Sequence, residues 1–145
     1  MIVAYTDGSC LGNPGLGGMG IVLVENDKAL MEIGIPSDDV TTNNRMELGA
    51  AIYITKHFID LGVSDLHIIT DSNYTVKGIN EWLHGWKKKD FKNVKNVDMW
   101  KEMDSLLPNI NLVVKWTKGH STNQFNNMAD RIAVEAAKTR QIVQR

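Results

Sequence analysis

Short runs of apolar residues recur along the chain, each bounded by glycine, proline or a polar pair. Runs of about four to eight residues that are rich in Val and Ile are typical of β-strands. The pattern predicts strands at residues 2–6, 21–24, 30–35, 66–70 and 112–116. The pair Asn26-Asp27 favours a hairpin between the second and third of them. The stretch from Gly8 to Gly18 is rich in glycine, and we expect it to form a loop.

A second pattern, with apolar residues three or four positions apart, indicates helices between the later strands. Met46, Ala50, Ile54 and Phe58 recur at this spacing before Gly62, which predicts a helix over residues 43–61. Further helices are expected near residues 73–86, 97–107 and 126–142. The order of elements favours an α/β fold, in which a five-stranded mixed sheet is flanked by helices in one domain over residues 1–145.

Composition indicates the size of this domain and the kind of cellular compartment in which it works. With 145 residues, 43% of them hydrophobic, the chain is long enough for one domain with a core of its own. Cys10 is the single cysteine, which excludes an intrachain disulfide and suits a reducing compartment. The sequence contains no apolar run long enough for a bilayer and no secretory leader. We therefore expect a cytoplasmic protein with no membrane partner.

Four carboxylates stand at positions where these elements begin or end. Asp7 follows the first strand and Asp71 the fourth, so both would project at one sheet edge if those strands are parallel neighbours. Glu47 and Asp130 lie near the starts of predicted helices, where the helix dipole favours an acidic group. Each residue alone fits a cap or a first-turn charge. Together they make an oxygen-only ligand set that suits Mg²⁺ or Mn²⁺ better than zinc.

The sequences around these carboxylates resemble the signature blocks of type 1 ribonuclease H. The matching blocks lie in order along essentially the whole chain: residues 5–15 (YTDGSCLGNPG), 42–48 (TNNRMEL), 70–74 (TDSNY), 118–120 (KGH) and 127–133 (NMADRIA). One such block would be weak evidence, whereas the full series is specific. The resemblance implies a ribonuclease H-like fold and an endonuclease that cuts the RNA strand of an RNA–DNA hybrid.

The same resemblance assigns roles to the acidic residues. It implies that Asp7, Glu47, Asp71 and Asp130 are catalytic and hold two Mg²⁺ ions, for which Mn²⁺ can substitute. One ion would lower the pKa of an attacking water and the other would stabilise the departing 3′ oxygen, leaving 5′-phosphate and 3′-hydroxyl ends. His120 matches a histidine that shuttles protons or assists product release.

Substrate contacts are implied for four asparagines. Asn13, Asn43 and Asn44 match positions that contact the hybrid near the cut, where the 2′-hydroxyl distinguishes RNA from DNA. Asn43 is also expected to be the N-cap of its helix. Asn73 departs from the family, which commonly has glutamine there, and this puts one base contact in doubt.

A lysine-rich segment is a candidate binding site for a polyanion, although the whole chain carries a net charge of −1. Residues 86–101 hold six lysines and two aspartates, with Lys87, Lys88 and Lys89 in a row. The segment resembles the family's basic protrusion, in a shorter form, and lysine–phosphate contacts give affinity without sequence preference. Trp82, Trp86 and Trp100, which lie in or just before this segment, are expected to pack in the core.

Other interpretations compete with the nuclease. A related two-metal polynucleotidyl transferase would share the sheet and the carboxylates, but not the block around Glu47. A non-catalytic hybrid-binding module would be expected to have lost a carboxylate. The stretch Gly15–Gly20 matches G-x-G-x-x-G, yet it leads into a strand and so offers no helix N-terminus for a pyrophosphate. Nothing in the sequence pairs Cys10 with His120 as a nucleophile. We expect a free-standing monomer without a separate hybrid-binding domain. The sequence does not identify its protein partners.

Overall fold

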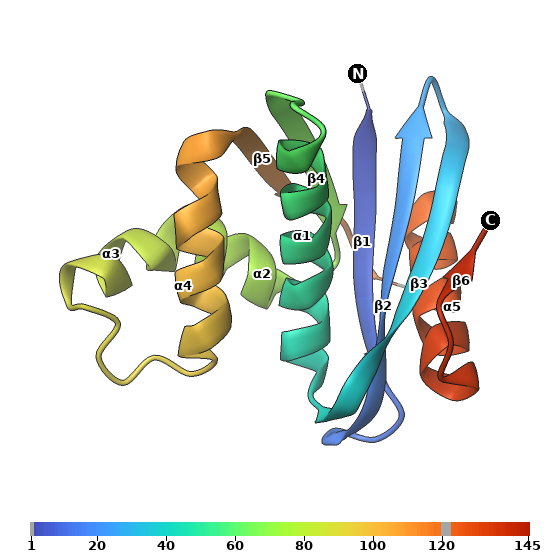
Figure 1. Cartoon of the computed structure of the whole chain (residues 1–145), viewed down its shortest axis with the longest axis horizontal. Coiled ribbons are helices and arrows are strands. Elements are labelled where there is room, and N and C mark those ends of the chain that lie inside the picture. Colours follow the sequence, from blue (N-terminus) through green and yellow to red (C-terminus); the bar gives the residue numbers. More distant parts are fainter. Residues whose placement is uncertain (1, 120–122) are drawn as a thin grey trace.

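The computed structural model describes residues 2–119 and 123–145, which form one mixed sheet with helices on both faces (Figure 1). Across the sheet the strands follow the order β5-β4-β1-β2-β3-β6. The central pair β1 and β4 is parallel, as is β4 with β5, while β1, β2, β3 and β6 pair antiparallel. The strands are β1 (Val3–Cys10), β2 (Gly15–Glu25), β3 (Lys28–Thr41), β4 (Asp65–Thr70), β5 (Asn111–Trp116) and β6 (Val143–Gln144).

The helices divide between the two faces, with α1 and α4 on one and α5 on the other (Figure 1). Because each face is covered, the sheet contributes to two apolar clusters. The larger lies under α1 and α4 and includes Ile21, Ile54 and Trp100; the smaller lies under α5 and includes Val22 and Phe125. The helices are α1 (Asn43–Asp60), α2 (Asn73–Lys77), α3 (Leu83–Lys88), α4 (Val97–Leu106) and α5 (Gln124–Thr139), with a π-turn, η1 (Gly78–Trp82), and a 3₁₀ turn, η2 (Leu107–Asn109).

Glycines in β2 let α5 lie close against the sheet. A Cβ atom at Gly20 would stand 2.0 Å from the carbonyl oxygen of Ala129, and one at Gly18 would stand 2.2 Å from that of Ala133. No side chain fits at such distances, so these positions need glycine for packing. The G-x-G-x-x-G stretch therefore lies in strand β2, where its glycines allow α5 to pack against the sheet. This agrees with the interpretation that it is not a nucleotide-binding loop.

The α/β prediction is confirmed, and the structure corrects several boundaries. The expected loop from Gly8 to Gly18 is mostly strand, since β1 continues to Cys10 and β2 begins at Gly15. The last helix begins and ends earlier than predicted, at Gln124 and Thr139. A short sixth strand, β6, was not expected; it follows Arg140, whose left-handed backbone ends α5. Of the tryptophans expected in the core, Trp100 is fully buried but Trp82 is 39% exposed.

Within residues 2–119 and 123–145, none of the helices combines the length and apolar character needed to cross a bilayer.

Candidate active site

The register of two parallel strands brings Asp7 and Asp71 to the same part of the sheet. Thr6 of β1 pairs with Thr70 of β4. The next residue along each strand is the aspartate, so the two carboxyl groups leave neighbouring strands at matching positions. Asp7 is 3% exposed, whereas Asp71 is half-buried. The sequence prediction that these strands are parallel neighbours is confirmed.

Gly8 lets the first turns of α1 approach this point. A Cβ atom at Gly8 would stand 2.3 Å from the backbone nitrogen of Glu47, so only glycine allows the helix to lie here. The backbone N–H of Gly8 donates to Asp7 Oδ1 at 2.9 Å. The helix begins after Thr42, whose side chain accepts from Arg45 N. The expectation that Asn43 is the N-cap was therefore wrong, because Thr42 takes that position and Asn43 is the first helical residue.

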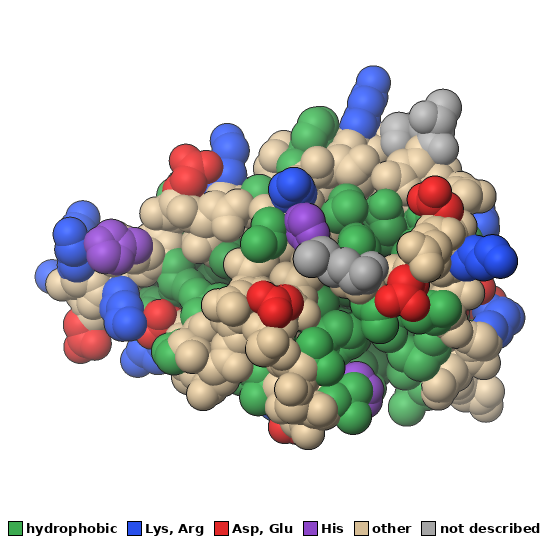
Figure 2. Space-filling model, turned by 90° about the horizontal axis from the view of Figure 1, so that it is seen from above, with side chains coloured by type: hydrophobic (Ala, Val, Ile, Leu, Met, Phe, Trp, Pro, Cys, Tyr) green, Lys and Arg blue, Asp and Glu red, His purple; other side chains and the backbone are tan. Residues whose placement is uncertain are grey.

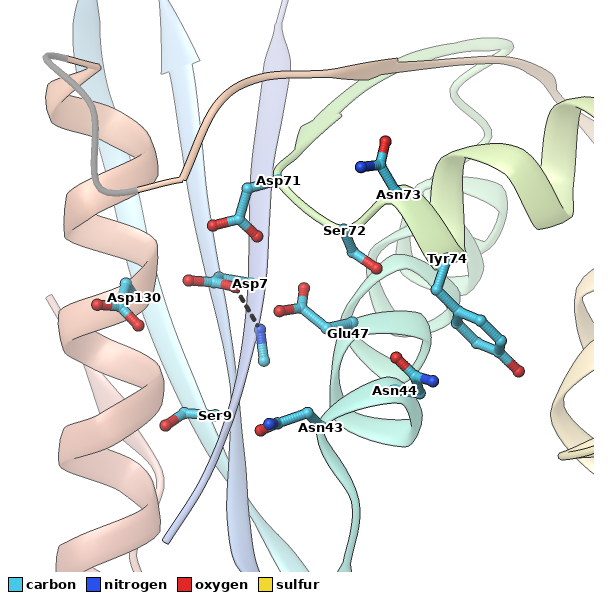
Figure 3. A pocket seen from close by; sticks show the side chains of 11 residues that line it. Asp7, Ser9, Asn43, Asn44, Glu47, Asp71, Ser72, Asn73, Tyr74 and Asp130 are labelled. Atoms are coloured by element: carbon cyan, nitrogen blue, oxygen red, sulfur yellow. Dashed lines mark hydrogen bonds between the residues drawn. The ribbon is translucent and has the colours of Figure 1, made fainter. Parts of the chain in front are cut away.

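Three carboxyl groups meet where these elements converge. Among the described residues, Asp7, Glu47 and Asp71 each offer an oxygen, and these atoms all lie within 4.8 Å of one another. Asp130 reaches the same cavity from α5, across from the other three (Figure 3). The cavity measures about 390 Å³, and its wall is formed by Asp7, Gly8, Ser9, Asn43, Asn44, Glu47, Asp71, Ser72, Asn73, Tyr74 and Asp130.

Burial and mutual repulsion change the acidity of the two innermost groups. Desolvation raises the pKa of Asp7 from 3.8 to about 7; a hydrogen bond to Glu47 opposes this rise, and the charges of Asp71 and Asp130 add to it. Desolvation, followed by the charge of Asp7, raises the pKa of Glu47 well above its ordinary value. In the absence of a cation, the site therefore retains protons that exposed carboxyl groups would have lost.

The donor set fits a divalent metal ion. Glu47 Oε2 is buried and accepts no hydrogen bond from the described residues, and a buried polar atom without a partner is costly. Carboxylate oxygens are the ligands that hard divalent cations prefer. A cation between Asp7, Glu47 and Asp71 would give Oε2 a partner and offset the repulsion among the three groups.

Comparison with known proteins assigns the chain to a family. Residues 1–138 match the sequence model of RNase H. The chain belongs to the RNase H family. It is 46% identical over 140 residues to the ribonuclease H of Francisella philomiragia, covering 93% of this chain and 90% of the relative, and equally similar to that of Francisella tularensis subsp. novicida. Its activity is accordingly that of a ribonuclease H.

Solved structures of the family have the same fold. LC9-RNase H1, a type 1 RNase H with the type 2 active-site motif, aligns with a TM-score of 0.87 at 26% identity, covering 99% of this chain and 77% of that one. The foamy viral protease–reverse transcriptase in complex with dsDNA aligns with a TM-score of 0.78 at 29% identity, covering 95% of this chain and 94% of that one.

The asparagines implied by the RNase H resemblance lie at or beside the cavity. Asn43, Asn44 and Asn73 line it (Figure 3). Asn13 accepts from the backbone N–H of Asn43 at 3.2 Å, and it lines a neighbouring hollow together with Asn44 and Lys95. His120 lies outside the described residues.

The lysine row stands apart from the carboxylates. Lys87, Lys88 and Lys89 lie at the end of α3 and do not line the acidic cavity. Figure 2 shows basic side chains projecting from the end of the molecule that carries this helix (left). Lys87 is 3.5 Å from Asp104 in an exposed ion pair.

Sequence reasoning missed several residues that shape the site. Ser9 and Tyr74 line the cavity beside predicted residues, and their places inside the matched blocks were the available signal. Arg45 makes a two-pronged contact with Asp98, at 3.0 and 2.8 Å, which joins α1 to α4. No sequence pattern points to this pair, because its members are 53 positions apart.

Proposed function

We propose that this ribonuclease H cuts the RNA strand of RNA–DNA hybrids with two Mg²⁺ ions held by Asp7, Glu47, Asp71 and Asp130. The observation that supports it best is the carboxyl trio, in which a buried Glu47 oxygen has no partner among the described residues and two groups have raised pKa values. Mn²⁺, which accepts the same oxygen ligands, is expected to substitute.

Two such ions, held by these carboxylates, would supply activation of a water molecule and stabilisation of the departing 3′ oxygen, and the products would carry 5′-phosphate and 3′-hydroxyl ends. The fold positions the carboxylates that would bind the ions. Asp7 and Asp71 are positioned by neighbouring strands, and Glu47 by helix α1, which can approach because residue 8 is glycine. As these groups take up metal they must release the protons that their raised pKa values retain. Activity should therefore increase with pH through the neutral range.

Substrate recognition is proposed for the surface around the cavity. Asn43, Asn44 and Asn73 line its wall, and Asn13 stands beside it, where their amides can reach base edges or a 2′-hydroxyl. Lys87, Lys88 and Lys89 would contact phosphates of the hybrid farther along the duplex. His120, which falls in the matched block after β5, is proposed to move a proton or assist product release.

We further propose that residues 1–145 act as one catalytic domain of a cytoplasmic monomer. The single domain is supported by the sheet, because the described residues form one six-stranded sheet that includes β6 at residues 143–144.

The decisive experiment incubates the protein with end-labelled RNA–DNA, RNA–RNA and DNA–DNA duplexes of one sequence, in Mg²⁺, in Mn²⁺ and in EDTA. We expect cutting of only the RNA strand of the hybrid, and none in EDTA. Comparable cleavage of duplex DNA would favour a related polynucleotidyl transferase. Hybrid binding without cleavage in any metal would indicate a non-catalytic module.

A further inference from the structure

Asn126 is a polar residue in a place where the fold needs an apolar one. It lies in the first turn of α5, and its side chain is 1% exposed. The buried residues that follow on the same helix, such as Ala129 and Ala133, are small and apolar. Burying an amide is unfavourable unless its hydrogen bonds are satisfied.

The hydrogen bonds of this amide are only partly satisfied. Asn126 Nδ2 lies 3.5 Å from Asp71 Oδ2, whereas Asn126 Oδ1 is buried with no partner among the described residues. A leucine of similar size would remove the unsatisfied oxygen from this buried position. The side chain thus contributes little to the stability of α5, and its one polar contact is to a carboxylate of the site.

Two other residues contact Asp71. Trp116 Nε1 donates to the backbone oxygen of Asp71 at 3.1 Å. A Cβ atom at Gly119 would stand 2.7 Å from Asp71 Oδ2, so the backbone of Gly119 abuts the carboxylate. Because Gly119 and the amide of Asn126 both lie at Oδ2, the Asp71 carboxylate is restricted in its rotation.

Asn126 also connects two carboxylates that come from different elements. Asp130 follows it by four residues on α5, and residues at this spacing lie on the same helical face. The amide therefore links Asp71, which directly follows β4, to the helix that carries Asp130.

We propose that Asn126 is a positioning residue, whose contact with Asp71 sets the separation between Asp71 and Asp130 before any metal binds. The inference rests on the proposed function, because the separation matters only if both carboxylates serve one metal site. Loss of the amide should leave the fold intact and weaken the binding of the ions that both groups hold.

The test compares Asn126→Leu with wild type and with Asn123→Ala. Asn123 is the N-cap of α5 and accepts from the N–H groups of Phe125 and Asn126, so its loss destabilises the same helix without removing the amide that contacts Asp71. Mg²⁺ binding is followed by calorimetry and by the rise in Tm, both of which are independent of catalysis. Hybrid cleavage is followed as kcat and KM over a Mg²⁺ titration.

For Asn126→Leu we expect a metal-free Tm at or above that of wild type, a half-saturating Mg²⁺ concentration at least about tenfold higher, and a lower kcat with KM for the hybrid little changed. For Asn123→Ala we expect a lower Tm and an unchanged Mg²⁺ midpoint. An unchanged midpoint in Asn126→Leu would overturn the inference, as would a fall in Tm with the midpoint shifted equally in both variants.

The wild-type protein separates this inference from the proposed function. If wild type binds Mg²⁺ but does not cut the hybrid, the proposed function fails while the positioning role is still decided by the Mg²⁺ midpoints. If wild type binds no Mg²⁺ at all, both fail.

Discussion

Burial gives Asp7 an acid–base behaviour that an exposed aspartate does not have. Its pKa rises from 3.8 to about 7, chiefly because the carboxylate is desolvated. A group whose pKa is higher in the folded state binds more protons there than in the unfolded chain. The contribution of Asp7 to the stability of the metal-free protein should therefore be fully present below about pH 4, and it should be lost as pH rises toward about 7 and beyond. Glu47, shifted in the same direction, adds to this loss.

Replacement of Asp7 by Asn isolates that effect, because the amide keeps nearly the same shape and its oxygen can still accept from Gly8 N. We predict that Asp7→Asn is inactive, yet at pH 8 without metal is more stable than wild type, by up to about 4 kcal/mol for a shift of about three pKa units. Its Mg²⁺-induced rise in Tm should be smaller.

Thermal melts from pH 4 to pH 8, with and without Mg²⁺, measure both quantities. The advantage of the variant should vanish near pH 4, where wild-type Asp7 is protonated in the folded state. A variant that melts well below metal-free wild type at pH 8 would mean that the Asp7 carboxylate is needed for the fold.

At the scale of single residues, the sequence identified the carboxylates that stand in family-specific blocks. It missed residues such as Asn126, whose role depends on a contact that exists only in the folded chain. The carboxylates stand in specific sequence blocks, so both their identity and their convergence could be predicted. The expected places at the ends of elements were wrong for Asp7, which lies inside β1, and for Asp130, which lies in the middle of α5. Asn126 lies one position before the last block, and nothing in its neighbours reveals that it is buried against Asp71. Such a role depends on the distance between β4 and α5, which only the folded chain defines.

Helix α5 is held at its depth by the glycines of β2, and this depth places Asp130. The carbonyl oxygen of Ala129, directly before Asp130, is the atom that a Cβ at Gly20 would meet at 2.0 Å. A side chain at residue 20 must therefore push the helix outward at the point where it carries the carboxylate.

We predict that Gly20→Ala loses about 1–3 kcal/mol of unfolding free energy through overpacking, and that it binds Mg²⁺ more weakly because Asp130 is displaced. Gly85→Ala is the matched control, since a Cβ there meets nothing within 4 Å and residue 85 lies in helix α3. Alanine should stabilise that helix by up to about 1 kcal/mol.

Denaturant unfolding and Mg²⁺ calorimetry on both variants make the comparison. Equal stability of Gly20→Ala and wild type would show that α5 adapts to the added methyl group, and the placement of Asp130 would then need another explanation.

The element boundaries that were wrong share a physical cause. Glycine was interpreted as a sign of a loop between Gly8 and Gly18, whereas Gly17 and Gly18 lie in β2, where close packing requires glycine. Sequence alone does not separate glycine needed for backbone freedom from glycine needed for a close approach. The two residues of β6 are too few to form a pattern, and they pair with β3 only after Arg140 turns the chain.

The acidic cavity and the lysine row lie in different parts of the molecule, whose net charge is only −1. The cavity carboxylates converge at the sheet, whereas the lysine row lies at the end of α3. Binding of the substrate's phosphates and cleavage of its phosphodiester bond would thus depend on different parts of the surface. Substitutions in one part should therefore weaken one of these properties and leave the other unchanged.

We predict that replacing Lys87, Lys88 and Lys89 together by Ala raises KM for the hybrid and flattens its dependence on salt, because fewer counterions are released on binding. kcat at saturation should stay near wild type. Lys28→Ala, at the start of β3 and exposed, is the control and should leave the salt slope unchanged. Steady-state kinetics at two or more salt concentrations decide the matter; an unaltered slope in the triple variant would exclude these lysines from the hybrid interface.

The four carboxylates belong to four elements that are far apart in sequence, at positions 7, 47, 71 and 130. Bringing them together requires β1, β4, α1 and α5 to have packed almost completely, so a partly ordered chain in the folding transition state has no complete cation site. Mg²⁺ should then slow the unfolding rate and leave the folding rate nearly unchanged, as expected for an interaction that forms after the transition state. Stopped-flow chevron plots with and without Mg²⁺ would reveal it: only the unfolding arm should move, and a shift confined to the folding arm would mean that the site forms early.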